Sequence, residues 1–210
     1  MHHPLKTYFS KYFPEAGCDE AGRGCLAGPV VAAAVILPRK PDKGLVTGLN
    51  DSKLLPAAKR MQLRELILQH ALSYGIAVVD NTVIDEINIL QASILAMHRA
   101  LRALNPQPAM IVVDGNRFNS YDDIPHSCVV KGDATYLSVA AASILAKTSR
   151  DALMETLDRD YPYYGWKNNK GYPTMKHKQA IGIHGLSPYH RRSFRYHIQW
   201  RIDFSRDEGE

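Results

Sequence analysis

Acidic residues stand at the ends of three predicted β-strands, and no histidine or cysteine accompanies them. The four carboxylates are Asp19, Glu20, Asp114 and Asp133. In α/β sheets ligands gather at the carboxyl ends of the strands, so these side chains can form one site. A site built only from carboxylate oxygens suits a hard cation, Mg²⁺ or Mn²⁺.

Such a cluster supports phosphodiester hydrolysis. Two divalent ions roughly 4 Å apart, held by shared carboxylates, generate the attacking hydroxide and stabilise the leaving oxygen. Adjacent strand residues point to opposite faces, so Asp19 and Glu20 share a site only where the strand ends or bulges, as the turn at Gly22 permits. The alternative is a structural role, because Asp133 precedes a predicted helix as an N-cap would, and Asp114 precedes a glycine as in a turn.

Hydrophobic patterning predicts the elements that position these residues. Strands are predicted over residues 16–21, 29–37, 74–79, 110–113 and 127–130. Helices are predicted over residues 56–71, 82–104 and 134–158. A capping box, Thr82 with Asp85, is expected to open the second helix. Three successive strands followed by strands that alternate with helices indicate a mixed sheet in an α/β domain.

Length and composition limit the class of protein. The chain has 210 residues, 45% of them hydrophobic and 22% charged, which predicts one sizeable domain and excludes disorder, collagen and coiled coil. Residues 24–37 form the longest near-apolar run, which is shorter than the roughly 20 residues that span a bilayer. Residues 1–13 lack the apolar core of a secretory signal. Three cysteines without a C-x-x-C pair favour free thiols in a reducing compartment, so we expect a cytoplasmic protein.

Positive charge is concentrated near the C-terminus. The formal net charge is +5, and residues 159–201 carry nine Lys and Arg side chains against one acid, Asp160. Aromatic side chains lie between them, among them Tyr161, Tyr163, Tyr164, Trp166, Tyr172 and Tyr189. A basic, aromatic segment is typical of a surface that binds a polyanion. The alternative is a solvated basic face without a partner.

Six short motifs, in order along residues 16–195, resemble those of the type 2 ribonucleases H, the ribonuclease HII family. They are D-E-A-G-R-G at 19–24, N-D-S-K at 50–53, V-D-G-N at 113–116, K-G-D at 131–133 with the segment 143–151, K-G-Y-P-T at 170–174 and S-P-Y-H-R-R-S-F at 187–194. The ordered set is much more specific than any one motif. The resemblance implies an RNase H-like α/β fold, a mixed five-stranded sheet flanked by helices with a small helical C-terminal part. Residues 1–158 would form the catalytic domain, and residues 159–210 a basic, aromatic, substrate-contacting segment packed on it.

The resemblance also implies an activity. It implies an endonuclease that cleaves the RNA strand of RNA–DNA hybrids and cuts at ribonucleotides embedded in duplex DNA, leaving 3′-hydroxyl and 5′-phosphate ends. Mn²⁺ or Mg²⁺ would be the cofactor, and the catalytic metal ligands would be Asp19, Glu20, Asp114 and Asp133. We expect a monomer without membrane association, whose partners are RNA–DNA hybrids and ribonucleotide-containing duplex DNA.

The resemblance assigns substrate contacts as well. The backbone of Gly22, Arg23 and Gly24 and the hydroxyl of Tyr172 would lie near the ribose 2′-hydroxyl, the group that distinguishes RNA from DNA at one position. Glycines let backbone amides approach a ligand closely. Phosphate contacts are expected from Lys53, Lys147, Arg191 and Arg192. Leu54 stands where the family frequently has a second lysine, and the acidic tail after Phe194 matches no motif.

Two other functions remain open from the residues alone. One is a nuclease of the same fold with another substrate, such as a DNA junction resolvase or a transposase-like enzyme. The other is a non-catalytic nucleic-acid-binding module that uses only the basic segment. The glycine-arginine-glycine turn and the K-G-Y-P-T segment oppose the first, and the presence of all four carboxylates opposes the second.

Overall fold

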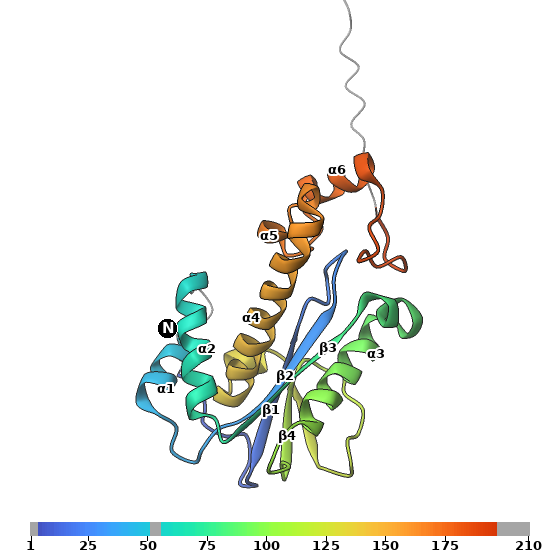
Figure 1. Ribbon diagram of the computed structural model, residues 1–210. Helices are drawn as coiled ribbons and strands as arrows, with labels where there is room; N and C mark the ends of the chain where they lie inside the picture. The colour runs from blue at the N-terminus through green and yellow to red at the C-terminus, as the bar shows by residue number, and fades with distance from the viewer. Residues whose placement is uncertain (1–3, 51–55, 197–210) are drawn as a thin grey trace, which may run out of the picture.

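A mixed sheet forms the centre of the molecule, in the order β3-β2-β1-β4-β5 (Figure 1). The computed structural model describes residues 4–50 and 56–196. The strands in these ranges are β1 (Glu15–Ala21), β2 (Val30–Ile36), β3 (Ser73–Val79), β4 (Met110–Asp114) and β5 (His126–Val129). β1, β2 and β3 pair antiparallel, whereas β4 runs parallel to β1 and β5 parallel to β4. The predicted mixed five-stranded sheet is therefore confirmed.

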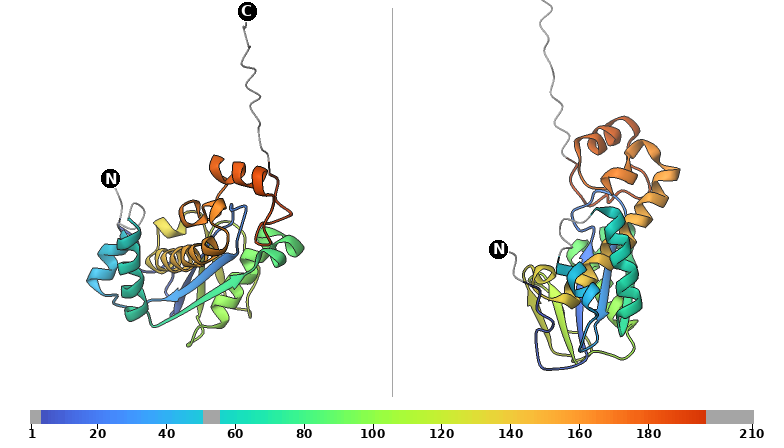
Figure 2. Two further views of the ribbon diagram at one scale, coloured as in Figure 1. Left: turned by 45° about the horizontal axis from the view of Figure 1, so that its top comes forward. Right: turned by 90° about the vertical axis from the view of Figure 1, so that its left-hand side faces the viewer.

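Helices cover both faces of this sheet (Figures 1 and 2). They are α1 (Lys43–Asn50), α2 (Ala57–His70), α3 (Asn81–Arg102), α4 (Leu137–Asp160), α5 (Trp166–Asn169) and α6 (Met175–His184), with short 3-10 turns η2 (Gly132–Ala134) and η3 (Pro162–Tyr164). Buried side chains of α3 pack with one face of the strands, and those of α1, α2 and α4 pack with the other. Each face of the sheet therefore has its own layer of buried side chains, one packed against α3 and the other against α1, α2 and α4.

Gly17 determines how closely α4 approaches the sheet. It lies in the middle of β1, and a Cβ built on it would overlap the backbone of Ser138 and Val139 in α4. Only glycine permits backbone contact this close. The helix is therefore held directly against the strand that carries the first two candidate carboxylates.

The start of α3 differs from its predicted form. Asp80 occupies the N-cap position, and the expected capping box of Thr82 and Asp85 is wrong. Asp85 instead accepts hydrogen bonds from the backbone amides of Arg192 and Ser193, at 2.9 Å each. The helix also has a kink at Asn88, whose φ of 66° is left-handed. The Asn88 side chain accepts hydrogen bonds from the next turn's amides, as an N-cap does.

Residues 161–196 form a C-terminal lobe beyond the end of α4, and Figure 2 shows this lobe at one end of the sheet. Its core joins Leu26 and Ala27, which follow β1, to Met154 of α4 and to Tyr164 and Trp166. Two of the aromatic residues expected to face a polyanion, Tyr164 and Trp166, are therefore buried and hold the lobe together. Among the helices that the structure describes, none is long and apolar enough to cross a membrane.

Candidate active site

The parallel pairing of β1 and β4 brings Asp19 and Asp114 together. Cys18 pairs with Val113 in this ladder, so the next residue of each strand lies beside its counterpart, on the face that α4 covers. Ser143 of α4 donates a hydrogen bond to the carboxylate of Asp19. Burial and the nearby charges of Glu20 and Asp114 raise the pKa of Asp19 well above its usual range. A buried acid whose pKa is raised by burial and by neighbouring carboxylates is typical of a functional site.

Glu20 faces the same site although it is the next residue on the strand. Its backbone amide donates to Asp19 Oδ1 at 2.7 Å, and its Oε1 lies 3.1 Å from Arg23 Nη1. Burial and the charge of Asp114 raise the pKa of Glu20, opposed by the guanidinium of Arg23. The charges of Glu20 and Asp114 therefore both raise the pKa of Asp19, so the three carboxylates influence one another electrostatically.

Asp133 directly follows a residue that is hydrogen-bonded to Asp114. The amide of Gly132 donates to Asp114 Oδ1 at 2.7 Å, which ties the η2 turn to the end of β4. The N-cap position of α4 is Tyr136 and that of η2 is Lys131. Asp133 therefore caps neither helix, and the structural alternative for this residue is not supported.

The carboxylates fit a hard cation by their chemistry. Within residues 4–50 and 56–196, no three acidic, histidine or cysteine side chains are already gathered around one point. However, Glu20 Oε2 is buried and has no hydrogen-bond donor among the described residues. A buried oxygen without a donor and mutually raised pKa values are both relieved by a bound cation. An all-oxygen donor set of this kind suits Mg²⁺ or Mn²⁺.

Two buried arginines hold the loop of residues 22–29 that follows β1. Arg191 donates to the carbonyls of Gly22 at 2.7 Å, Arg23 at 2.9 Å and Gly28 at 3.0 Å. Arg150 donates to the carbonyls of Ala27, Pro29 and Lys170 at 3.0, 2.8 and 2.7 Å. The loop therefore turns these carbonyls inward. A Cβ built on Gly24 would meet no heavy atom within 4 Å among the described residues, so the outer side of the loop is open there.

The expectation that Arg191 contacts phosphate is wrong for this structure. Its side chain is 0% exposed, and the carbonyls of the loop take up its donors. Burial and the positive charge of Arg150 lower the pKa of Arg191 to about 10, so it stays cationic at neutral pH. Arg191 supports the loop from inside and does not reach a ligand outside it.

Tyr172 lies against the same loop, far from it in sequence. The amide of Leu26 donates to the Gly171 carbonyl at 2.8 Å, and a Cβ on Gly171 would lie 2.5 Å from the Ala27 carbonyl oxygen. Gly171 also has a φ of +82°, which favours glycine. The Tyr172 ring is 41% exposed, and its hydroxyl is hydrogen-bonded to the thiol of Cys25. The ring is therefore fixed beside the loop while part of it faces solvent.

The expected phosphate-binding residues have different surroundings. Lys147 is partly buried, with its Nζ 5.7 Å from the centre of the Tyr172 ring and 2.8 Å from Asp151 Oδ1. Arg192 has an exposed side chain, and Lys53 lies outside the described residues. The structure thus brings Lys147 to the tyrosine and leaves Arg192 at the surface.

Arg150 and Ser143 are the residues of this site to which sequence reasoning gave no role. Both lie in the matched segment 143–151, which was the available signal. Buried arginines without a carboxylate partner are uncommon, so a sequence pattern favours an exposed position for such a residue. Arg150 is 1% exposed and bonds only to carbonyls among the contacts above.

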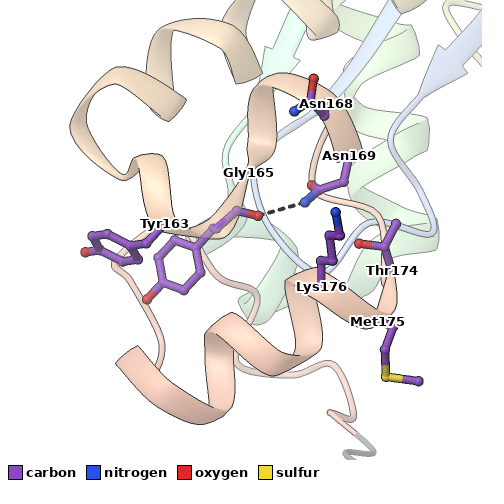
Figure 3. Close-up of a pocket in the computed structure, with 8 residues that line it drawn as sticks. Tyr163, Gly165, Asn168, Asn169, Thr174, Met175 and Lys176 are labelled. Carbon is purple, nitrogen blue, oxygen red and sulfur yellow. Dashed lines mark hydrogen bonds between the residues drawn. The ribbon is translucent and has the colours of Figure 1, made fainter.

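A separate pocket of about 480 Å³ opens on the C-terminal lobe, and Figure 3 shows its lining. Tyr163 and Gly165 line one side, and Thr174, Met175 and Lys176 at the start of α6 line the other. None of the four candidate carboxylates lines it. The pocket is therefore distinct from the carboxylate site.

Comparisons with known proteins agree with this arrangement. A family model described as ribonuclease HII matches residues 16–199. A ribonuclease HII of Bacteroides thetaiotaomicron is 58% identical over 190 residues, covering 90% of this chain and 94% of that protein. A ribonuclease HII of Christiangramia forsetii is 54% identical over 201 residues, covering 95% and 100%.

Solved structures give the same result. Ribonuclease H2 of Pyrococcus horikoshii superimposes with a TM-score of 0.73 at 28% identity, covering 87% of this chain and 94% of that one. The ribonuclease HII of Archaeoglobus fulgidus, solved in a complex with PCNA, gives 0.70 at 26% identity, covering 85% and 92%. The fold and the sequence point to one family.

Proposed function

The chain belongs to the ribonuclease HII family, and from that premise we propose how its residues perform the family's reaction. The protein is an endonuclease that cleaves RNA in RNA–DNA hybrids and cuts at ribonucleotides embedded in duplex DNA. We propose that it leaves 3′-hydroxyl and 5′-phosphate ends. One observation carries the proposal: the carboxylates at the ends of β1 and β4 share an edge of the sheet with the loop against which Tyr172 packs.

Asp19, Glu20, Asp114 and Asp133 are the proposed metal ligands. A bound Mg²⁺ or Mn²⁺ would activate water and stabilise the leaving oxygen of the cleaved phosphodiester. A ribonuclease HIII of the same fold has been solved in complex with Mn²⁺, which supports a divalent ion of this class. The protein's own part is to hold the carboxylates in place: Ser143 orients Asp19, and the Gly132 amide orients Asp114.

The 22–29 loop and Tyr172 are the proposed readers of the ribose. With the Gly22 and Arg23 carbonyls bonded inward to Arg191, the open outer side of the loop at Gly24 is available to a sugar. The Tyr172 hydroxyl can exchange its bond to the Cys25 thiol, a weak hydrogen-bonding group, for one to a 2′-hydroxyl. A deoxyribose lacks that hydroxyl, so the interaction selects ribose.

Lys147, Arg192 and Lys53 are the proposed phosphate contacts, which position a duplex without reading its sequence. Residues 1–158 are proposed as the catalytic domain and residues 159–210 as the segment that contacts substrate. We further propose that the protein acts as a monomer in the cytoplasm, in line with its three free thiols, Cys18, Cys25 and Cys128.

A site-resolved cleavage map tests the proposal. The substrates are a DNA duplex with a single ribonucleotide and the same duplex made entirely of DNA, each with Mg²⁺ or Mn²⁺ and with a chelator. We expect one metal-dependent cut at the ribonucleotide and none in the all-DNA duplex. Cleavage of both duplexes would indicate a nuclease with another substrate, and binding without cleavage would indicate a non-catalytic module.

A further inference from the structure

A buried line of hydrogen bonds runs beneath Tyr172. Trp166 Nε1 donates to His177 Nε2 at 3.0 Å, and His177 Nε2 lies 3.1 Å from His190 Nε2. The amide of Ser187 donates to His190 Nδ1 at 2.9 Å. His177 Nδ1 lies 2.9 Å from the main-chain carbonyl oxygen of Tyr172. The line therefore ends on the residue proposed to read the ribose.

The donors fix the proton positions on both rings. His190 Nδ1 accepts from Ser187, so the proton of the neutral ring is on Nε2 and is donated to His177 Nε2. His177 Nε2 accepts from His190 and from Trp166, so its proton is on Nδ1 and is donated to Tyr172. Each neutral imidazole has one donor and one acceptor, and both are used.

The surroundings keep both rings neutral and rigid. Burial lowers the pKa of His177, and burial with the nearby His177 ring lowers that of His190 to about 4. Tyr164 stacks on Trp166, with ring centres 5.0 Å apart, and meets the edge of His190 at 4.6 Å. The rings of His177 and His190 are therefore held in place by the aromatic side chains around them.

The other end of the line is anchored on α3. Asn81, the first residue of that helix, donates its side-chain amide to the carbonyls of Pro188 and His190, at 2.9 and 3.4 Å. The Gly28 amide donates to the Tyr189 carbonyl at 2.9 Å, which ties the same segment to the 22–29 loop. The histidine pair therefore connects the main body of the protein to Tyr172.

Tyr172 receives little other support from its own segment. Its amide donates to the Asn169 carbonyl at 2.9 Å, and its carbonyl accepts from Thr174 at 2.8 Å, both within five residues. The bond from His177 joins the Tyr172 carbonyl to the buried core of the lobe, as the bond from the Leu26 amide does for the preceding Gly171 carbonyl. Its loss would free the Tyr172 carbonyl while the Gly171 carbonyl stays bonded to Leu26, so the orientation of the ring would change without unfolding of the segment.

We propose that His177, held by His190, is a positioning residue that sets the selectivity of this enzyme for the 2′-hydroxyl through the main chain of Tyr172. The inference rests on the proposed role of Tyr172 and names the group that orients it. Neither histidine touches substrate in this proposal.

Two nearly isosteric variants test it. His177→Asn keeps a donor at the position of Nδ1, whereas His177→Leu has none, and both remove Nε2. Both leave Trp166 and His190 without their acceptor, so we expect both melting temperatures to fall, and that of His177→Leu to fall further because it also loses the bond to Tyr172. On the single-ribonucleotide duplex, His177→Leu should lose about 10-fold in kcat/KM, the size expected for one lost hydrogen bond. His177→Asn should stay within about 3-fold of the unaltered protein, because its donor is retained.

A double-mutant cycle identifies the route of the effect. If His177 acts through the Tyr172 hydroxyl, His177→Leu should cost less than about 3-fold in a Tyr172→Phe background, because coupled residues are non-additive. Equal losses for His177→Asn and His177→Leu, or additive losses in the cycle, would overturn the inference and leave the pair a packing unit. The unaltered protein is measured first, on the single-ribonucleotide duplex and on the all-DNA duplex. If it cleaves both equally, the proposed function itself is overturned, whatever the variants do.

Discussion

Arg191 and Gly22 are 169 positions apart in the chain, yet the guanidinium Nη2 donates to the glycine carbonyl at 2.7 Å. The same side chain also bonds to the carbonyls of Arg23, Gly28 and Pro29. The conformation of the loop beside the carboxylates therefore depends on a residue near the end of the described chain.

Arg191→Ala should lower stability strongly. It leaves the buried carbonyls of Gly22, Arg23 and Gly28 without this donor, and an unsatisfied buried polar group costs about 1–3 kcal/mol. We expect the free energy of unfolding, measured by urea denaturation, to fall by about 3 kcal/mol or more. Arg192→Ala, at the exposed neighbouring position, is the matched control and should change it by less than about 0.5 kcal/mol. Equal stabilities of the two variants would contradict the supporting role of Arg191.

Arg192→Ala should instead weaken the salt dependence of binding. A lysine or arginine that neutralises one phosphate contributes about 0.9 log units of affinity per log unit of salt on B-form DNA. We expect the slope for a hybrid duplex, measured by titration at several salt concentrations, to fall by about one contact. An unchanged slope would remove Arg192 from the proposed phosphate contacts.

Asp114→Asn should abolish cleavage and keep the fold. A neutral amide is a poor ligand for a hard cation, so we expect turnover in Mg²⁺ or Mn²⁺ to fall by about 100-fold or more. The asparagine oxygen can still accept from Gly132, and the charge that raises the pKa of Asp19 and Glu20 is gone. The melting temperature without metal should therefore not decrease.

Asp123→Asn is the control for this charge change, because Asp123 is exposed and lies outside the carboxylate site. It should cleave like the unaltered protein. Substrate binding by Asp114→Asn should persist, since the proposed phosphate contacts are elsewhere. Near-normal turnover of Asp114→Asn in saturating metal would exclude Asp114 from the site.

Tyr172→Phe deletes only the hydroxyl proposed to bind the ribose. A hydrogen bond between neutral groups contributes about 0.5–1.5 kcal/mol, so cleavage of a single-ribonucleotide duplex should slow roughly 2- to 13-fold. Tyr172→Ala also removes the ring and should cost about 100-fold or more through lost positioning. Tyr163→Phe, on the exposed ring of the separate pocket, should change the rate little. A Tyr172→Ala protein that cuts at the normal rate would show that Tyr172 only packs.

Stability should decrease as the pH falls from about 6.5 to about 4. The pKa of His190 is lowered to about 4 in the folded protein, whereas an unfolded histidine titrates near 6.5. The unfolded chain therefore takes up the proton first, and the stability present above pH 6.5 is lost progressively toward pH 4. Urea unfolding across this range measures the slope. His190→Phe should flatten it, and His184→Gln, at an exposed histidine, should leave it unchanged.

The centre of the sheet could be predicted from sequence because β2 and most of β4 are apolar runs, and β2 is buried along its whole length. Helix α1 was not predicted, since eight residues containing Gly44 and Gly48 give a weak helical pattern. The kink at Asn88 was also missed, because it lies inside a continuous apolar stripe. Hydrophobic periodicity identifies a helix or a strand, but it does not show where a helix is kinked.

The neighbouring positions of Asp19 and Asp114 could be predicted because acids at the ends of paired strands carry a direct chemical signal. The role of Arg191 could not be predicted. In a basic segment, the sequence pattern does not distinguish an exposed arginine that contacts phosphate from a buried arginine that bonds to main-chain carbonyls. Tyr164 and Trp166 were misplaced for a similar reason: aromatic rings suit both a nucleic-acid surface and a core. Only the packing of residues that are distant in sequence shows which of these arginine and aromatic side chains are buried.

The arginine bonds to the 22–29 loop also set an order of assembly. They span 121 to 169 positions, so the loop cannot take its final form until Arg191 has been synthesised. At translation rates of about 5–20 residues per second, the stretch after α4 takes on the order of seconds to appear. A nascent chain thus carries its acidic residues before the 22–29 loop, the proposed reader of the ribose, has the arginine that holds it. Under the proposed function, discrimination between ribose and deoxyribose can be complete only after Arg191 has bonded to the 22–29 loop.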